Sequence, residues 1–323
     1  MPSSISNSDP IAAGVERVPR AGRIDRQGVA LIATMLAVVL IAELVSRVGF
    51  DRVSKVQRRE LSQRSELLRV KDTNPAAPGH IAVLGNSLML DGTNVALLTE
   101  KMEGSRVPVP YFVLGTEYTD WYFALKRLFA EGMRPSYVVL GLSPNQLAST
   151  YTRGDYSARY LFQASDLPGV IRATHMNATR ASGFLLAHFS EFYSAREVIR
   201  SFVQGQTLPA VADLLHNQVG NGRAPELDQA LLAETAAERL SALDRLCREN
   251  GTHFVLVVPP TYQKGAETLA RVGGERNLSV LTPLAFNEVD GSFYQADGFH
   301  LNDRGAELFT TRLAGELRKL PVD

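Results

Sequence analysis

The stretch HIAVLGNSLMLDG, residues 80–92, decides how the rest of the chain is interpreted. Residues 81–85 form a run of apolar and small side chains, which indicates a buried β-strand. Ser87 follows two residues later, where the chain turns toward a helix. Two interpretations are open at this point. Ser87 can serve only to cap the helix, or it can be a nucleophile on a strand-to-helix turn that needs a base and an acid from elsewhere in the chain.

The pattern of residues 80–92 recurs downstream and predicts the fold class. Further apolar runs stand at residues 109–115, 136–142 and 253–260, with a weaker run at 278–283. Helical stretches separate them, so we expect an α/β fold, a flavodoxin-like doubly wound parallel sheet covered on both faces. In such sheets the ligand site lies beyond the carboxyl ends of the strands. Gly85, Gly115 and Leu142 all fall at those ends.

The N-terminal part of the chain predicts a membrane anchor. Residues 1–26 are rich in Ser, Pro, Gly and Arg without an apolar period, which indicates a disordered tail. Residues 27–46 carry Glu43 as their one charge, and about twenty apolar residues cross a bilayer core of ~30 Å. A buried helix of a soluble protein is the alternative, but such a helix is rarely apolar on all sides. Basic residues stand on both sides of this span, so the positive-inside rule gives no orientation.

Two further segments complete the predicted organisation. Residues 47–79 predict a charged helical stalk and a linker that ends in a Pro- and Gly-rich break. Residues 80–323 predict the main domain, with a helical insertion at about 151–235. The insertion is too long for an ordinary connection in such a fold, and it would suit a cap over the active-site face.

Composition excludes several classes of protein and site. Lys+Arg and Asp+Glu both number 34, and without a basic excess we expect no binding to nucleic acid. Cys247 is the one cysteine, so no disulfide can form within the chain. The histidines show neither a His-x-x-His nor a His-Glu-x-x-His spacing. We therefore expect no metal and no other cofactor.

The segment DGFHLND near the C-terminus supplies the partners that a nucleophilic Ser87 requires. Asp297 precedes His300 by three residues, and Asn302 or Asp303 can cap the amphipathic helix that follows. A carboxylate in that position can accept a hydrogen bond from one ring nitrogen of the histidine, while the other nitrogen faces the serine. We therefore expect Ser87 Oγ within ~3 Å of His300 Nε2, and Asp297 in contact with Nδ1.

Taken together, VLGNSLMLDG and the distant DGFHLNDRG resemble the first and last motif blocks of the SGNH (GDSL-type) hydrolase superfamily. The resemblance covers most of residues 80–318, apart from the insertion. It implies that Ser87 is the nucleophile and that Asp297 and His300 complete the triad. It also implies that the backbone N–H of Gly115, in VLGTEYTD, helps to form the oxyanion hole.

The chain departs from the family pattern at two places. Asn86 stands where the first block usually has aspartate, and Ser143 stands where the third block has the asparagine of the oxyanion hole, with Asn145 two residues later. These departures resemble membrane-anchored SGNH-like proteins of polysaccharide O-acetylation or teichoic acid D-alanylation. That resemblance implies a domain outside the cytoplasm on the inner membrane, a glycan substrate, an acyl donor and a multi-pass membrane O-acyltransferase as a possible partner.

Three functional outcomes stay open on the sequence. The same triad serves an acyltransferase and an esterase, since the acyl group can pass to a sugar hydroxyl or to water. A catalytically inactive scaffold that binds glycan and partners a membrane acyltransferase is the alternative, favoured by the departure at Ser143. Tyr118, Trp121 and Tyr122 follow Gly115 and could line a sugar cleft, but aromatic packing in the core is the commoner outcome.

Overall fold

The structure, a computed structural model, describes residues 26–72, 79–196, 199–200 and 227–321. The predicted tail, the linker break at 73–78 and residues 201–226 of the insertion lie outside the described residues. The chain forms two units, Met1–Leu44 and Val45–Asp323. Each is described by itself below.

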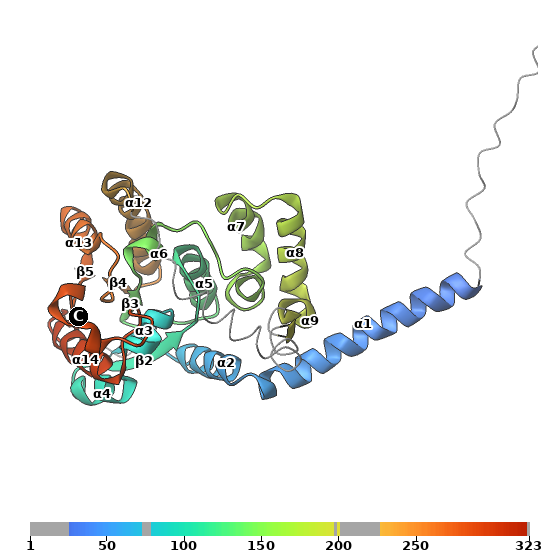
Figure 1. Ribbon diagram of the computed structural model, residues 1–323, viewed down its shortest axis with the longest axis horizontal. Coiled ribbons are helices and arrows are strands. Elements are labelled where there is room, and N and C mark those ends of the chain that lie inside the picture. Colours follow the sequence, from blue (N-terminus) through green and yellow to red (C-terminus); the bar gives the residue numbers. More distant parts are fainter. Residues whose placement is uncertain (1–25, 73–78, 197–198, 201–226, 322–323) are drawn as a thin grey trace, which may run out of the picture. The chain divides into compact units, whose positions relative to one another are not determined.

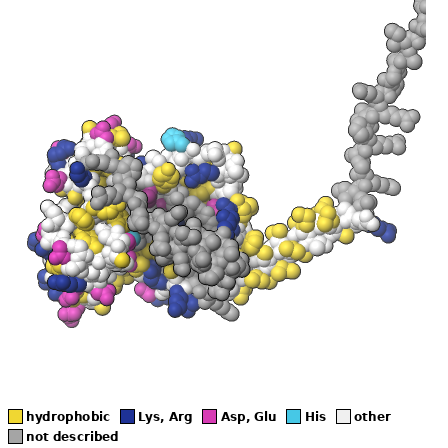
Figure 2. Space-filling model, in the orientation of Figure 1, with side chains coloured by type: hydrophobic (Ala, Val, Ile, Leu, Met, Phe, Trp, Pro, Cys, Tyr) yellow, Lys and Arg dark blue, Asp and Glu magenta, His cyan; other side chains and the backbone are white. Residues whose placement is uncertain are grey.

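Helix α1, Arg26–Val53, contains the predicted membrane span. Its segment Arg26–Gly49, 24 residues, is long and apolar enough to cross a membrane. Its large apolar side chains are open to solvent; Leu31 is 63% exposed and Leu40 is 68% exposed. Figure 2 shows these hydrophobic side chains along the helix surface. An apolar helix of this length whose large apolar side chains are exposed is typical of a membrane anchor.

The second unit is built on a sheet of five strands, all parallel, in the order β2-β1-β3-β4-β5. The strands are β1 (His80–Gly85), β2 (Val107–Phe112), β3 (Tyr137–Gly141), β4 (His253–Val257) and β5 (Ser279–Leu281). The α/β class and the parallel sheet are thus confirmed. Strand β2 lies earlier than predicted, because the chain leaves the sheet after Phe112 and turns at Gly115, whose φ is +66°.

Successive side chains of each strand point to opposite faces of the sheet and build two cores. Ile81 and Val83 pack under α3 (Ser87–Gly92), α4 (Val95–Lys101) and α14 (Asp303–Leu317). Ala82 and Leu84 pack on the other face under α5 (Tyr118–Ala130), α12 (Gln229–Arg248) and α13 (Ala266–Glu275). Both faces of the sheet are therefore covered by helices, as Figure 1 shows.

Helix α2, Lys55–Leu67, occupies the segment predicted as a stalk. The helix is present as expected, and Ser54 caps its N-terminus. However, one face of α2 packs against the domain. Leu67 is fully buried in the core beside β2, and Glu60 is 1% exposed. The charges of α2 are therefore not all in solvent, and part of this helix is needed to complete the core.

The described part of the insertion forms short helices beside α5. They are a π-helical turn (Ser157–Leu161), a 3-10 turn (Ala164–Asp166), α7 (Leu167–Ala173), α8 (Ala178–Phe189) and α9 (Glu191–Ser194). Phe162 stacks edge-on between Phe123 of α5 and the tilted ring of Phe184. Arg127 of α5 also donates hydrogen bonds to carbonyls of this insertion. These contacts are with α5 rather than with the turn that carries Ser87, and α12 begins before the predicted boundary at 235.

Candidate active site

The turn between β1 and α3 holds Ser87 at the carboxyl edge of the sheet. Ser87 is the first residue of α3 and is half-buried, so it is accessible. Helix α3 can lie this close to the strands because Gly85 and Gly141, paired across β1 and β3, have no side chains. A Cβ at either glycine would lie 2.1–2.3 Å from Met89 Cγ of α3. The two glycines therefore fix where the serine emerges.

Asn86, the residue before Ser87, caps α3 and binds the neighbouring loop. Its Oδ1 accepts a hydrogen bond from the N–H of Leu88 at 3.1 Å, and its Nδ2 donates to the carbonyl of Thr116 at 2.9 Å. The side chain is 1% exposed. An aspartate, which the SGNH first block usually has here, could not donate to a carbonyl when ionised. The asparagine thus joins the Ser87 turn to the loop that contains Gly115.

A tight turn before α14 carries Asp297 and His300. The N–H of Gln295 donates to the carbonyl of His300 at 2.7 Å, which closes the turn. Asn302 then caps α14, accepting hydrogen bonds from the N–H groups of Arg304 and Gly305. Of the two residues considered for this cap, Asn302 is the one that forms it. The cap fixes the chain just after His300.

Ser87, His300 and Asp297 form a hydrogen-bonded chain. His300 Nε2 lies 2.9 Å from Ser87 Oγ, and His300 Nδ1 lies 2.6 Å from Asp297 Oδ2. The side chains of His300 and Asp297 are 21% and 32% exposed. Both contacts expected from the sequence are therefore present, and the group is reachable from solvent. That these residues are catalytic stays a prediction.

Asp297 is held as a carboxylate by its hydrogen bonds. Burial alone would raise its pKa, but hydrogen bonds from the His300 side chain and from the N–H groups of His300 and Phe299 outweigh burial and lower the pKa below the usual value of 3.8. An ionised Asp297 accepts a hydrogen bond from Nδ1–H and so favours that tautomer of the neutral imidazole. In this tautomer Nε2 carries no proton and can accept the hydrogen bond of the Ser87 hydroxyl.

Gly115 lies in the loop after β2, and one hydrogen bond ties this loop to the Ser87 turn. The Asn86–Thr116 hydrogen bond connects the residue before Ser87 with the residue after Gly115. Among the described residues the N–H of Gly115 takes part in no hydrogen bond, so it is available to an oxyanion. The position needs glycine for its positive φ rather than for space, since an added Cβ would meet only Arg153 Cγ, at 3.9 Å.

The third-block residues behave differently from the family pattern. Ser143 is fully buried and forms a reciprocal cap of α6 (Pro144–Ala148) with Gln146, whose Oε1 accepts from the N–H of Ser143 at 2.9 Å. It is therefore a structural cap. Asn145 is half-buried on α6, and in the described part of the chain no hydrogen bond joins it to Ser87 or His300. Hydrogen bonds thus join three of the five predicted residues directly and connect the loop of Gly115 to the Ser87 turn. The role expected for Asn145 stays a prediction.

A buried ionic cluster supports the Gly115 loop from behind. Glu60 of α2 accepts a hydrogen bond from the N–H of Leu114 at 3.3 Å and forms an ion pair with Arg153 at 3.2 Å. Asp120 of α5, fully buried, accepts from the N–H groups of Glu117 and Arg153. Burial raises the pKa of Asp120 to about 7, although hydrogen bonds from Ser157, Glu117 and Arg153 act in the opposite direction. None of these residues belongs to a motif that predicts the site from sequence.

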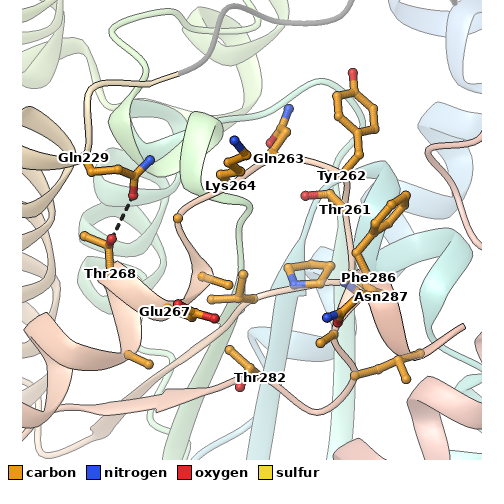
Figure 3. A pocket seen from close by; sticks show the side chains of 18 residues that line it. Gln229, Thr261, Tyr262, Gln263, Lys264, Glu267, Thr268, Thr282, Phe286 and Asn287 are labelled. Carbon is orange, nitrogen blue, oxygen red and sulfur yellow. Dashed lines mark hydrogen bonds between the residues drawn. The ribbon is translucent and has the colours of Figure 1, made fainter.

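A cavity of about 620 Å³ opens at the carboxyl ends of β4 and β5. Figure 3 shows Tyr262, Thr261 and Phe286 on one side and the hydrogen-bonded pair Gln229 and Thr268 on the other. Tyr262 also packs on Phe299, the neighbour of His300, with ring centroids 5.6 Å apart. By contrast, Trp121 is fully buried against Tyr111 in the core. Trp121 therefore follows the commoner outcome, packing in the core, and the aromatic rings beside His300 come from other segments.

Comparison with models of known protein families and with curated proteins finds no match to this chain. Within the described ranges, no three His, Cys, Asp or Glu side chains are grouped to hold a metal ion. The case for a function therefore rests on the geometry of Ser87, His300 and Asp297 and on the surfaces around them.

Proposed function

We propose that this protein is a membrane-anchored, SGNH-like, serine-dependent acyltransferase or carbohydrate esterase that acts on O-acyl groups, such as acetyl, of an extracytoplasmic polysaccharide. The observation that carries the proposal is the hydrogen-bonded chain from Ser87 through His300 to Asp297. The strand order β2-β1-β3-β4-β5 also supports it, since that is the order of flavodoxin-like sheets, whose ligands bind at the carboxyl edge.

The chemistry follows from the positions of the three side chains. Ser87 Oγ attacks the carbonyl carbon of an acyl ester or thioester while His300 Nε2 takes the hydroxyl proton. The tetrahedral intermediate then collapses, and His300 returns the proton to the leaving oxygen or sulfur. Asp297 stays ionised and stabilises the imidazolium throughout. The acyl-serine that remains is cleaved by a sugar hydroxyl or by water, which His300 deprotonates in turn.

The oxyanion of the intermediate needs donors close to Ser87. The N–H of Ser87 stands at the first position of α3, where a helix offers no internal partner. The N–H of Gly115 is the second donor in this proposal. Each such donor contributes roughly 3 kcal/mol to lowering the barrier. Ser143 is occupied in capping α6, so the site works with backbone donors where the family also uses an asparagine side chain.

The acyl donor in this proposal reaches the site at the membrane. A multi-pass membrane O-acyltransferase could deliver acyl groups to Ser87, and the glycan would accept them. Helix α1 would hold the enzyme at the membrane where such a partner resides. The inactive scaffold is the competing function, and the departure at Ser143 is what favours it.

The test is hydrolysis of a nitrophenyl acetate by the full chain in mild detergent. We expect turnover by the wild type and a loss of ~10³-fold or more in Ser87→Ala, because no other group can take the acyl. Ser143→Ala is the matched control; it removes a serine at the next strand end and should cost about 1 kcal/mol of stability while keeping most activity. Full activity in Ser87→Ala would exclude this serine as the nucleophile. An inactive wild type that binds glycan would favour the scaffold.

The location outside the cytoplasm has its own test. A reporter enzyme that works only outside the cytoplasm, fused after Asp323, should be active in cells that produce the full chain. The physical reason is that polysaccharide acceptors lie outside, and one span places the whole of the second unit on one side of the membrane. Activity of a reporter that works only in the cytoplasm would contradict the polysaccharide role.

A further inference from the structure

The cavity beyond β4 and β5 has the lining of a carbohydrate site. Its volume of about 620 Å³ is within the ~300–1,000 Å³ usual for small-ligand pockets. Its lining combines apolar residues, such as Val258, Pro259 and Leu284, with amide and hydroxyl side chains and two aromatic rings; the latter include Gln263, Asn287, Thr261, Thr282, Tyr262 and Phe286. Sugars present hydroxyls for such polar groups and C–H faces for aromatic rings. The lining chemistry therefore suits a neutral, polyhydroxylated ligand.

Charge argues against an anionic ligand in this cavity. Lys264 and Glu267 are the charged residues of its lining, one of each sign, and both are exposed. Recognition of phosphate or carboxylate ligands generally uses arginine pairs or clusters of basic groups. The lining has no arginine among the described residues. A neutral ligand matches this balance better than a charged one.

One polar atom of the lining lacks the partner that a ligand would supply. Gln263 Oε1 is buried, and within the described residues it has no hydrogen-bond partner. A buried carbonyl oxygen without a donor costs about 1–3 kcal/mol, so such atoms are rare unless something else satisfies them. Because this oxygen is closed to solvent, a sugar hydroxyl can donate to it only once the Gln263 side chain turns into the cavity. This observation is independent of the aromatic lining.

The cavity is connected to the triad through aromatic contacts. Tyr262 packs against Phe286 at 6.4 Å and against Phe299 at 5.6 Å between ring centroids. Phe299 in turn lies edge-on to the ring of His300, at 5.1 Å. The rings of Phe286, Tyr262 and Phe299 thus form a continuous row that ends at His300. A chain of sugar rings seated along this row would bring a hydroxyl toward the triad.

We propose that this cavity is the acceptor subsite, binding the neutral sugar residues next to the hydroxyl that exchanges the acyl group. The inference deepens the proposed function and rests on it for the role of acceptor. Tyr262 and Phe286 supply the surface for the sugar faces, and Gln263 accepts a hydrogen bond from a hydroxyl. Sugar binding itself requires no chemistry at Ser87, so it can be measured separately.

The experiment measures binding of two probes, a β-1,4-linked glucose hexasaccharide and an N-acetylglucosamine hexasaccharide, to the full-length Ser87→Ala chain in detergent by calorimetry. We expect at least one probe to bind. Its Kd should rise about tenfold or more when Tyr262→Ala or Gln263→Ala is added, because losing a stacked ring or a buried hydrogen bond costs ~1–3 kcal/mol of binding free energy. Phe189→Ala is the matched control, an aromatic residue of α8 that is 63% exposed and outside the cavity. It should leave Kd unchanged.

Several outcomes would overturn the inference. One is that neither probe binds. Another is that Tyr262→Ala and Gln263→Ala both leave Kd at the value of the Ser87→Ala chain, while circular dichroism shows that these variants are folded. A third outcome would overturn the inference by showing that the cavity binds the acyl chain of the donor. Tyr262→Ala, in a chain with Ser87 intact, would then change the relative rates of hydrolysis of nitrophenyl esters with acyl chains of two to eight carbons. Sugar binding would be unchanged. The ester hydrolysis that depends on Ser87 is read in a separate assay, so failure of the subsite and failure of the enzyme proposal are distinguishable.

Discussion

Two polar networks meet near the Ser87 turn, and they differ in almost every physical respect. The first joins Ser87, His300 and Asp297 near the surface, with His300 21% and Asp297 32% exposed on their side chains. The second joins Glu60, Arg153 and Asp120, where the side chain of Glu60 and the residue Asp120 are fully buried and the side chain of Arg153 is 23% exposed. The first presents a hydroxyl and a ring nitrogen near the surface. The second connects α2 and α5 with the segment around Arg153.

The difference explains how charge is used in each network. In the exposed network, hydrogen bonds to Asp297 outweigh burial and its pKa is lowered. In the buried network, burial outweighs the hydrogen bonds to Asp120 and its pKa rises to about 7. A perturbed carboxyl in this molecule is therefore not by itself a sign of catalysis. Its position relative to an accessible nucleophile decides which of the two roles it can have.

The largest effect is expected from Asp297→Asn. The amide NH₂ would face His300 Nδ1 and favour the tautomer with a proton on Nε2, which cannot accept the proton of Ser87. We expect ester hydrolysis to fall by about 10³ to 10⁴. The melting temperature should stay close to that of the wild type, because the amide oxygen of the substituted side chain can still accept the backbone hydrogen bonds of Phe299 and His300. Stopped assays with nitrophenyl acetate and a thermal melt by circular dichroism measure both.

Asp303→Asn is the control for that substitution. Asp303 is exposed at the first position of α14, three residues after His300, and makes no contact with the triad among the described hydrogen bonds and ion pairs. It should retain activity. Equal losses in both variants would mean that the carboxylate of Asp297 has no special relation to His300.

The second effect is expected from Glu60→Gln, and it concerns stability. Removing one partner of a buried ion pair lowers the free energy of unfolding by ~3–5 kcal/mol. Here the loss should be smaller, because the side chain of Arg153 is 23% exposed and water can hydrate its charge. We therefore expect the full chain to lose about 2 kcal/mol, measured by thermal unfolding. Arg271→Gln, which breaks an exposed pair with Glu275 on α13, should cost less than ~0.5 kcal/mol. A Glu60→Gln chain as stable as that control would show that the buried cluster is not needed to hold α2 on the domain.

The sequence alone was sufficient for the parts of the site that are coded locally. An apolar strand followed by Gly-Asn-Ser predicts the Ser87 turn, and Asp297 and His300 are close enough in sequence to form a recognisable motif. The 213-residue separation between Ser87 and His300 was bridged by the order of the two motifs and by their resemblance to the first and last SGNH blocks. The class of fold and all five strands followed from the same periodicity.

The parts that were missed depend on contacts between distant segments. Glu60 looked like one charge in a charged stalk, and only the fold shows that it meets Arg153, 93 residues later. Tyr262 and Phe286 stand alone in sequence, and only the arrangement of the loops after β4 and β5 places them together. The role expected for Asn145 stays a prediction; the structure places this residue on α6, whose N-terminus Ser143 caps.

The smallest effect is expected from Asp120→Asn, and it sharpens the comparison through pH. The folded chain holds Asp120 with a pKa of about 7, raised by burial from the ordinary 3.8. Between these values the folded state binds a proton that the unfolded state has released. Stability therefore falls as pH rises toward 7 and becomes level above it. Between pH 6 and 7 this carboxyl accounts for about 1 kcal/mol of the change. Asp120→Asn should remove that part of the pH dependence, whatever its effect on absolute stability, because asparagine does not titrate.

The measurement compares melting temperatures at pH 6 and 7 for the wild type, Asp120→Asn and Asp228→Asn. Asp228→Asn is the control, because it replaces the exposed N-cap of α12 by an equally good capping residue. An unchanged pH dependence in Asp120→Asn would mean that the buried network is already fully ionised at pH 6, and that burial does not separate the two networks in the way their structures indicate.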